Sequence, residues 1–204
     1  MKLDCHTHSK RFSACSIISP DELLNIAREK GLDGLVFTEH EQFWPPEDIR
    51  WLRKAFPTLK IFNGVEISVG SLQHVVVIPP FVRKEILNLN TPAELEKYLD
   101  KNGGFAFAAH PYRWGYDFGD KNIDYSLPAV EVASSNMNEP ELVQKSLNFA
   151  RKSDARPVAS SDAHSADPVG RYYIETVKLP HKQKRLVECL CAGEFTAVAP
   201  ELDL

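Results

Sequence analysis

The chain has 204 residues, of which 43% are hydrophobic and 25% are charged. These values are close to the averages of globular proteins, and they exclude a disordered chain, a fibrous chain and a small disulfide-stabilised one. The 24 basic and 28 acidic side chains give a formal charge of −4, which excludes a general attraction of the whole surface to nucleic acid or to an anionic membrane.

The sequence predicts a cytoplasmic protein without membrane association that folds as one domain over residues 1–204. Its longest apolar runs, such as 105–109 and 75–78, are far shorter than a membrane span, and Met1 leads directly into a strand-like segment without a signal peptide. The four cysteines contain no CxxC pair, so they are expected to be free thiols.

In chain order, the first half alternates strand-like and helix-like segments. A strand is predicted at 2–7, and Ser19 caps a helix at about 20–30 that Gly31 ends in a left-handed conformation. The elements expected next are a buried strand at 34–38, a helix near 47–55, strands at 60–67 and 74–78, and a helix that begins after the capping box of Thr91 and Glu94 and ends at 102–104.

Strands are expected in the second half at 105–109, 129–133 and 157–160, with a helix opening at Asn138 between the last two. A strand at 173–179, a helix at 182–192 and a strand at 195–199 complete the chain. Roughly seven short apolar strands that alternate with helices are typical of an α/β fold with a parallel sheet or a barrel.

One long irregular segment, residues 111–128, carries the aromatic residues Tyr112, Trp114, Tyr116, Phe118 and Tyr125. Loops of this length inside a compact domain are more often functional than idle. The sequence therefore leaves two interpretations open, a substrate loop and a loop that packs its own aromatic side chains as a small core.

Histidines and isolated acids gather at the ends of the predicted strands. His6 and His8 are two apart at the end of the first strand, so both point to one face together with Asp4. The other residues at strand ends are His40, Glu66, His74, His110, Asp162 and His164, and all but His74 lie at the carboxyl end. Carboxyl ends of barrel strands meet at one mouth, so we expect these side chains to converge there.

Imidazole and carboxylate ligands without thiolate suit Mn, Fe or Zn. Without a metal, so many buried imidazoles would be energetically costly. The number of candidate ligands is too large for one ion, and two or three ions that share Glu66 as a bridging ligand are the economical arrangement.

The chain resembles the PHP family, the polymerase and histidinol phosphatase superfamily of metal-dependent phosphoesterases. The resemblance covers nearly the whole chain and rests on Asp4-x-His6-x-His8, Thr38-Glu39-His40, Gly64-Val65-Glu66, Ala109-His110-Pro111 and Ser161-Asp162-Ala163-His164. It implies a distorted (β/α)7 barrel, similar to a TIM barrel, with a di- or trinuclear metal centre at its mouth.

The resemblance also implies a set of ligands. His6, His8, Glu66 and Asp162 would hold the first metal, Glu66, His74 and His110 the second, and His40 and His164 a third. The residues predicted to be catalytic are His40, Glu66, Asp162 and His164.

Two positions depart from the family pattern. Ala14 stands where members with a full third site place a His or an Asp, and Cys15 beside it is expected either to replace that ligand as a thiolate or to pack as a buried thiol. Glu39 replaces the Asp common in the family, and we expect it to orient a histidine.

Two arginines are predicted to bind the substrate phosphate, because a planar guanidinium offers two parallel donors to phosphate oxygens. Arg113 follows His110 on the mouth loop, and Arg171 follows the loop that carries Asp162. The alternative for each is a surface role or an ion pair with Asp117 or Asp167.

The predicted function is hydrolysis of a small phosphorylated substrate, a phosphomonoester or phosphodiester, through in-line attack by a hydroxide that bridges the metals. The leaving oxygen would be protonated by a metal-bound water, by His164 or by His40. One alternative is a nuclease or nucleotide phosphatase that acts on short oligonucleotides or nucleotide bisphosphates, with Trp114 and Tyr116 stacking on bases. The other alternative is a regulatory module that binds metal without turnover.

Overall fold

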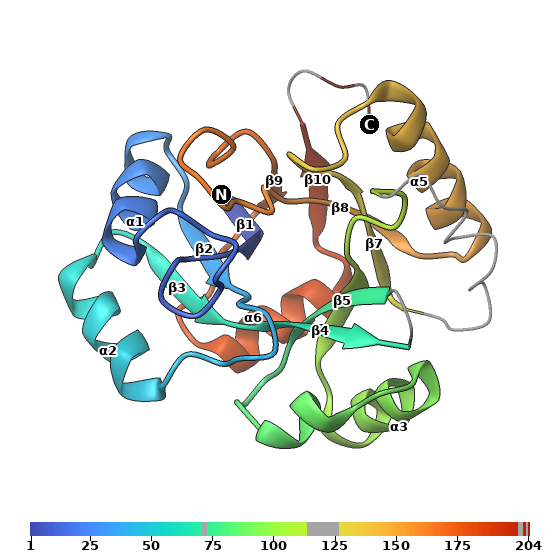
Figure 1. Cartoon of the computed structure of the whole chain (residues 1–204), viewed down its shortest axis with the longest axis horizontal. Coiled ribbons are helices and arrows are strands. Elements are labelled where there is room, and N and C mark those ends of the chain that lie inside the picture. Colours follow the sequence, from blue (N-terminus) through green and yellow to red (C-terminus); the bar gives the residue numbers. More distant parts are fainter. Residues whose placement is uncertain (71–72, 114–126, 200–201, 203) are drawn as a thin grey trace.

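The computed structural model of the chain describes residues 1–70, 73–113, 127–199, 202 and 204. Within these residues it contains two five-stranded sheets surrounded by helices (Figure 1). The helices are α1 (Pro20–Glu29), α2 (Pro46–Ala55), the short 3₁₀ helix η1 (Lys84–Asn88), α3 (Pro92–Asn102), α5 (Pro140–Lys152) and α6 (Gln183–Ala192). None of the helices in the described residues has the length and apolar composition needed to cross a bilayer.

The first sheet has the strand order β10-β9-β1-β2-β3. Its strands are β1 (Lys2–Thr7), β2 (Gly34–Phe37), β3 (Lys60–Asn63), β9 (Tyr173–Thr176) and β10 (Phe195–Val198). β1, β2 and β3 are parallel, whereas β9 is antiparallel to both β1 and β10. Helices α1 and α2 lie on the outer side of this sheet (Figure 1).

The second sheet has the strand order β4-β5-β6-β7-β8. Its strands are β4 (Val65–Val69), β5 (Gln73–Ile78), β6 (Phe105–Ala108), β7 (Ala129–Ala133) and β8 (Arg156–Ala159). β4, β5 and β6 form an antiparallel meander, and β6, β7 and β8 are parallel. The expected α/β fold is confirmed as a mixed fold that combines parallel and antiparallel strands.

The described strands do not join into one closed barrel, so the (β/α)7 arrangement is not confirmed. The strands also depart from a (β/α)7 repeat, because β4 and β5 are antiparallel neighbours and antiparallel strands can be joined without a crossover helix. β8 nevertheless lies beside β9 and β10, and single bridges from Thr7 to Ala163 and from His40 to Glu66 link the two sheets.

Gly64 explains why the strand expected at 60–67 is two strands. β3 ends at Asn63 and β4 begins at Val65 in the other sheet, so the chain crosses between sheets at this glycine. The Gly64 N–H donates to the carbonyl of Phe37 at 2.8 Å. A methyl group on Gly64 would lie 3.0 Å from a Val36 methyl group and 3.1 Å from the Val77 carbonyl oxygen.

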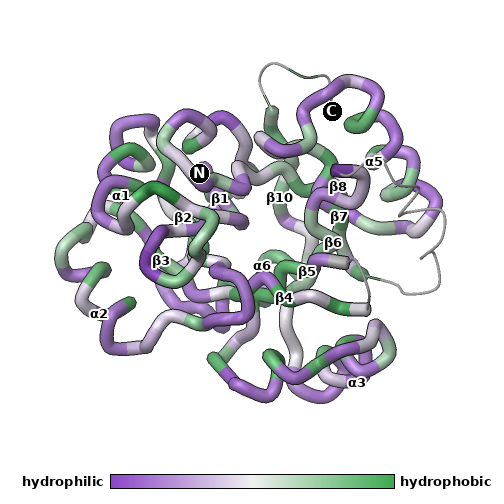
Figure 2. The backbone as a smooth tube through the Cα atoms, in the orientation of Figure 1, coloured by the Kyte–Doolittle hydropathy of each residue, from purple (hydrophilic) through white to green (hydrophobic). Residues whose placement is uncertain are grey.

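Apolar side chains form three layers of core. One lies between the first sheet and helices α1 and α2, and a second lies between the second sheet and helices α3 and α5. The third lies between the two sheets and is closed by Leu186, Val187 and Leu190 of α6. In Figure 2 the outer helices carry mostly hydrophilic residues, whereas hydrophobic residues concentrate on the central strands.

Most predicted element boundaries agree with the structure within two residues. Gly31 has a φ of +76°, as expected for the residue that ends α1, and Thr91 and Glu94 form both bonds of a capping box at α3. The helix expected to open at Asn138 begins instead at Pro140, after Glu139, whose side chain makes no capping bond. Pro140 sets the start, because proline is favoured in the first helical turn.

We expect Gly64→Ala to destabilise the protein by about 1–3 kcal/mol, because the new methyl group presses on the Val77 backbone, which cannot move as a side chain can. The measurement is urea denaturation followed by circular dichroism. Ser68→Ala is the control, because the Ser68 side chain is exposed on the same strand β4. Equal denaturation midpoints for Gly64→Ala and the unmodified protein would contradict the prediction.

Candidate metal centre

Three adjacent clusters of potential metal ligands lie at the ends of the strands. In each, the ligand atoms lie within 4.8 Å of one another. The first cluster is His6, His8, Glu66 and Asp162, the second cluster is Glu66, His74 and His110, and the third cluster is His8, His40 and His164. The structure therefore brings together all eight residues that were predicted as ligands, in the predicted grouping, with His8 added to the third set. Their metal ligation stays a prediction.

Strand geometry explains the position of most of these residues. His6 and His8 lie at the end of β1, and His110, Asp162 and His164 follow the ends of β6 and β8. Glu66 was expected at a carboxyl end and is instead the second residue of β4. Glu66 lies opposite Val76 in the antiparallel register, so His74, two residues from Val76 on β5, shares its face. The Nδ1 atom of His74 is 3.0 Å from Oε1 of Glu66.

Two of the candidate ligands have left-handed backbone conformations that residues other than glycine rarely adopt. His110 has a φ of +29° and Asp162 has a φ of +48°. Such a conformation costs on the order of 1–3 kcal/mol and persists where surrounding bonds hold it. Here the His110 N–H donates to the Glu131 carboxylate at 2.8 Å, and the Asp162 N–H donates to the His6 carbonyl at 2.9 Å.

In the first cluster, four side-chain atoms point at one another. The Nε2 atoms of His6 and His8 are 3.0 Å apart, and each is 3.2 or 3.3 Å from Oε2 of Glu66 and Oδ1 of Asp162. The side chains of the two histidines are fully buried, and those of the two acids are 1% exposed.

Hydrogen bonds on the far side of each imidazole indicate its tautomer. The Nδ1–H of His6 donates to the Glu131 carboxylate at 3.1 Å. The Ser13 hydroxyl donates to Oε2 of Glu39, so it accepts from the Nδ1–H of His8 at 3.2 Å. When either histidine is neutral, its hydrogen lies on Nδ1 and its Nε2 lone pair is directed into the first cluster.

These residues fit a divalent cation. The buried oxygens Oε2 of Glu66 and Oδ1 of Asp162 have no hydrogen-bond partner, and the Nε2 atoms of His6 and His8 face them. Buried polar atoms without partners are strongly unfavourable, and a cation among them would satisfy all four at once. The ligand types are imidazole nitrogen and carboxylate oxygen, which suit divalent metals.

Electrostatic coupling within the cluster shifts the pKa of several groups. Burial lowers the pKa of His6, but the carboxylates of Asp162, Glu131 and Glu66 outweigh it and raise that pKa well above its usual value. Burial raises the pKa of Asp162 and of Glu66, but neighbouring histidines, His6 foremost, hold both pKa values below their usual range. The carboxylates therefore favour the protonated form of His6.

Burial shifts the pKa of His164 and the pKa of Asp4. Burial and the adjacent His8 lower the pKa of His164, so its neutral, lone-pair form is favoured. Burial raises the pKa of Asp4 to about 7. Asp4 belongs to none of the three clusters of described residues. Its carboxylate accepts the backbone N–H groups of His6 and Ser161 instead, so its role is to hold the two ligand loops together.

Three residues at the centre were missed from the sequence. Glu131 bonds His6 and His110, Ser13 bonds His8, and the Asn136 amide donates to Oδ2 of Asp162 at 2.6 Å. Glu131 had a detectable signal, because it is an acid in the otherwise apolar strand β7, and a fully buried carboxylate needs partners. Ser13 and Asn136 are polar loop residues without such a signal.

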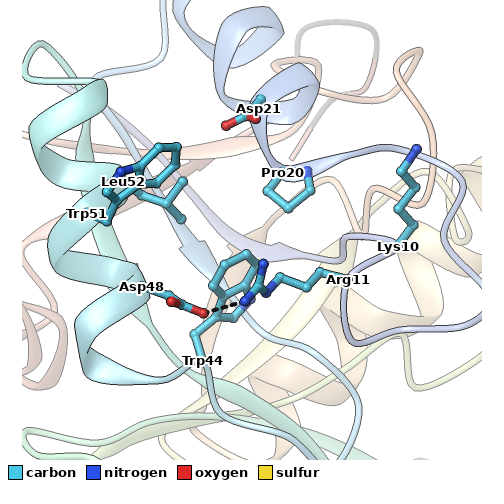
Figure 3. Close-up of a pocket in the computed structure, with 8 residues that line it drawn as sticks. All are labelled: Lys10, Arg11, Pro20, Asp21, Trp44, Asp48, Trp51 and Leu52. Atoms are coloured by element: carbon cyan, nitrogen blue, oxygen red, sulfur yellow. Dashed lines mark hydrogen bonds and ion pairs between the residues drawn. The ribbon is translucent and has the colours of Figure 1, made fainter.

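Glu39 was expected to orient a histidine, and it contacts His8 indirectly through Ser13. Its buried carboxylate accepts from Ser9, Ser13 and the indole Nε1–H of Trp44, and reaches His8 only through the Ser13 hydroxyl. Trp44 also lines a cavity of about 540 Å³ between α1 and α2 (Figure 3). The residues that line this cavity are Lys10, Arg11, Pro20, Asp21, Trp44, Asp48, Trp51 and Leu52.

The two arginines predicted to bind phosphate have different environments. Arg113 lies beside the centre, with Nη1 3.7 Å from Oδ2 of Asp162. Arg171 forms an ion pair with Asp167 at 3.0 Å, which is the alternative that the sequence left open for it. Their binding to phosphate stays a prediction.

The remaining sequence predictions concern the cysteines, Ala14 and the aromatic loop. All four cysteines are free thiols, as expected. Cys15 is exposed rather than buried, and it belongs to none of the ligand clusters of the described residues. Ala14 beside it is exposed as well. Of the aromatic loop at 111–128, the residues Trp114, Tyr116, Phe118 and Tyr125 lie outside the described residues, so both interpretations of that loop stay open.

Comparison with known proteins supports the resemblance. A family model described as PHP-associated matches residues 140–195, a region that includes Asp162 and His164. An uncharacterized protein of Methanocaldococcus jannaschii is 29% identical over 146 residues, which are 65% of this chain and 81% of that protein. The resemblance to the PHP family is thereby confirmed.

Solved structures share the fold. A putative metal-dependent phosphoesterase from Bifidobacterium adolescentis has a TM-score of 0.61 at 16% identity and covers 92% of this chain and 95% of its own. An amidohydrolase from Chromobacterium violaceum has a TM-score of 0.63 at 16% identity, and the alignment covers 98% of this chain and 99% of the amidohydrolase chain. A lesion-specific endonuclease from Pyrococcus furiosus has a TM-score of 0.61 at 17% identity, with 96% of this chain and 57% of that one aligned.

We expect metal binding to release protons at pH 7, because the raised pKa values of His6 and His8 keep protons on the nitrogens that a metal would occupy. Apparent affinity should therefore rise with pH, by about tenfold per pH unit for each proton displaced. Calorimetric titration with zinc in two buffers of different ionisation enthalpy measures this release. His181→Gln, an exposed histidine outside the clusters, should leave it unchanged, and a pH-independent affinity would contradict the prediction.

Proposed function

We propose that this protein is a metal-dependent hydrolase of phosphate esters that acts on a small phosphorylated substrate. The observation that carries the proposal is the first cluster, in which two imidazole nitrogens and two unpartnered carboxylate oxygens converge within a buried site. Glu66 also belongs to the second cluster, so one carboxylate would bridge two ions. The similarity in fold to a putative phosphoesterase supports the same class of reaction.

The three clusters would hold two or three divalent ions, with Mn, Fe and Zn as the candidates. Ions bound there would lower the pKa of water and neutralise negative charge on a phosphoryl oxygen. Among the chain's own residues, Glu66 and Asp162 balance the positive charge, and the buried histidines fix the positions of the ions. We further propose that residues 1–204 act as one domain, because the core between the sheets joins side chains from β1 to α6.

At the mouth, partly exposed side chains would bind and protonate the substrate. Arg113 is 24% exposed, with Nη1 3.7 Å from Oδ2 of Asp162, and we assign to its guanidinium the binding of the non-bridging oxygens of a phosphate. Arg171 is the second candidate. His40 is 34% exposed, with Nδ1 3.0 Å from Glu66. With two ions bound and the third cluster without one, we assign to His40 protonation of the leaving oxygen. The lowered pKa of His164 favours a ligand role over proton donation.

The reaction can be distinguished from its alternatives by substrate. Proteins of this fold include an amidohydrolase and an endonuclease, so the substrates tested should cover more than one bond type. A monoesterase would cleave nitrophenyl phosphate, and a diesterase would cleave bis-nitrophenyl phosphate. An amidase would cleave nitroacetanilide. A nucleotide phosphatase would cleave a nucleotide bisphosphate, and a nuclease would cleave a dinucleotide. A protein that binds metal stoichiometrically and cleaves none of them would be a regulatory module.

We expect Glu66→Gln to lower metal-dependent release of nitrophenol by at least about 100-fold, because this residue contributes to two ligand clusters. The assay is nitrophenyl phosphate hydrolysis after loading with Mn, Fe or Zn, with metal content measured by elemental mass spectrometry. His181→Gln is the control for a histidine outside the clusters. Full activity of Glu66→Gln, or activity of the unmodified protein without metal, would overturn the proposed function.

We expect Arg113→Lys to raise KM for a phosphomonoester by about tenfold with less effect on metal content, because lysine keeps the charge but loses the paired donors. Steady-state kinetics of Arg113→Lys and Arg171→Lys measure the two candidates under the same conditions. A KM unchanged in both variants would exclude both arginines from phosphate binding.

A further inference from the structure

We infer that Glu131 is a positioning residue that holds ligands of the first and second clusters in place at the same time. It was absent from the residues expected from the sequence, and it belongs to none of the ligand clusters among the described residues. The inference rests on the metal centre of the proposed function, because it concerns residues that would bind the ions.

Both oxygens of the Glu131 carboxylate are engaged. Oε1 accepts from the Nδ1–H of His6 at 3.1 Å and from the Ser160 hydroxyl, and Oε2 accepts from the backbone N–H of His110 at 2.8 Å. The side chain is fully buried, so water does not replace these donors. The carboxylate therefore joins the ends of three strands, β1, β6 and β8, to its own strand β7.

The bond to His6 acts on the first cluster. Because a carboxylate only accepts hydrogen bonds, it keeps the hydrogen of His6 on Nδ1 and leaves Nε2 free to face Glu66 and Asp162. The same bond crosses from the second sheet, which holds β7, to the first sheet, which holds β1. Without it, the ring of His6 would lose both its preferred tautomer and its orientation.

The bond to His110 acts on the second cluster. His110 has a φ of +29°, and in this conformation its N–H donates to Oε2 of Glu131. Nε2 of the same residue is 3.1 Å from Oε1 of Glu66. If the acceptor were lost, a buried N–H would be left without a partner, and the residue would be free to relax to a negative φ that withdraws its side chain.

Glu39 provides a matched comparison inside the same centre. It is also a fully buried glutamate, but among the described residues its carboxylate accepts hydrogen bonds from Ser9, Ser13 and Trp44 and from no candidate ligand. Through Ser13 it supports His8, which belongs to the first and third clusters and not to the second. Replacing either glutamate by glutamine removes one buried carboxylate of the same size, so a difference between the two variants reports on position and not on charge.

The experiment is competitive zinc titration of the metal-free protein with a chromophoric chelator, which resolves the binding steps. For Glu131→Gln we expect a loss of about 10- to 100-fold in affinity at both the first and the second cluster. For Glu39→Gln we expect a loss at the first cluster and no change at the second. Nitrogen-15 NMR of the histidine rings in the zinc-loaded proteins assigns the steps, because the signals of His6 and His110 should change only in Glu131→Gln.

Unchanged zinc affinity at both clusters in Glu131→Gln, or an identical pattern of losses in the two variants, would overturn the inference. If Glu131→Gln does not fold, Ser160→Ala tests the inference instead, because it removes one donor to Glu131 and leaves the carboxylate in place. Weaker zinc binding of Ser160→Ala at both clusters supports the inference. Unchanged zinc binding overturns it. Failure of the unmodified protein to bind zinc would overturn the proposed function as well. Zinc binding without ester hydrolysis would overturn the proposed function alone.

Discussion

The structure depends on the compensation of charge in a buried site. Glu66 and Asp162 are almost fully buried, and each lies within 4 Å of several imidazole nitrogens. A carboxylate in a protein interior is strongly unfavourable unless positive charge or hydrogen-bond donors surround it. Here protons on imidazole supply part of that charge, and a divalent ion would supply it more completely. The same requirement that makes the site costly in the metal-free protein makes it suitable for metals.

The two-sheet architecture brings these groups together. His6, His8 and His40 come from the first sheet or follow its strands, whereas Glu66, His74 and His110 come from the second or follow its strands. The chain passes between the sheets at Gly64, where Val36 and the Val77 backbone leave no room for a side chain. The centre therefore lies where the sheets meet. The first and third clusters combine residues of both sheets, whereas all residues of the second cluster belong to the second sheet or follow its strands. Metal binding and the association of the sheets should stabilise each other.

The buried ligands and the partly exposed mouth have different roles. The ligand set suits hydrolysis in general, and proteins of the same fold are described as a phosphoesterase, an amidohydrolase and an endonuclease. Selection among such bonds would fall to residues at the mouth, such as Arg113, His40 and Asn136, which contact or adjoin the ligands and are partly open to solvent. The four residues of the first cluster are almost fully buried, whereas groups that bind a substrate must be accessible.

The sequence by itself determined the chemistry of the site and most of the elements, because metal ligands have a narrow set of residue types and period-two strands place them predictably. The pair His6 and His8 and the isolated acids Glu66 and Asp162 could be selected as candidate ligands for this reason, and the structure brings them together. Tertiary structure alone decided that the strand predicted at 60–67 divides at Gly64 into strands of two different sheets. It also decided that both sheets combine parallel and antiparallel strands, because strand direction depends on contacts between distant segments. It also decided that Glu131 serves His6 and His110, and that Glu39 serves His8 through Ser13. A hydrogen bond between residues more than a hundred positions apart, such as that of His6 with Glu131, has no local signal in the chain and exists only once the sheets have packed.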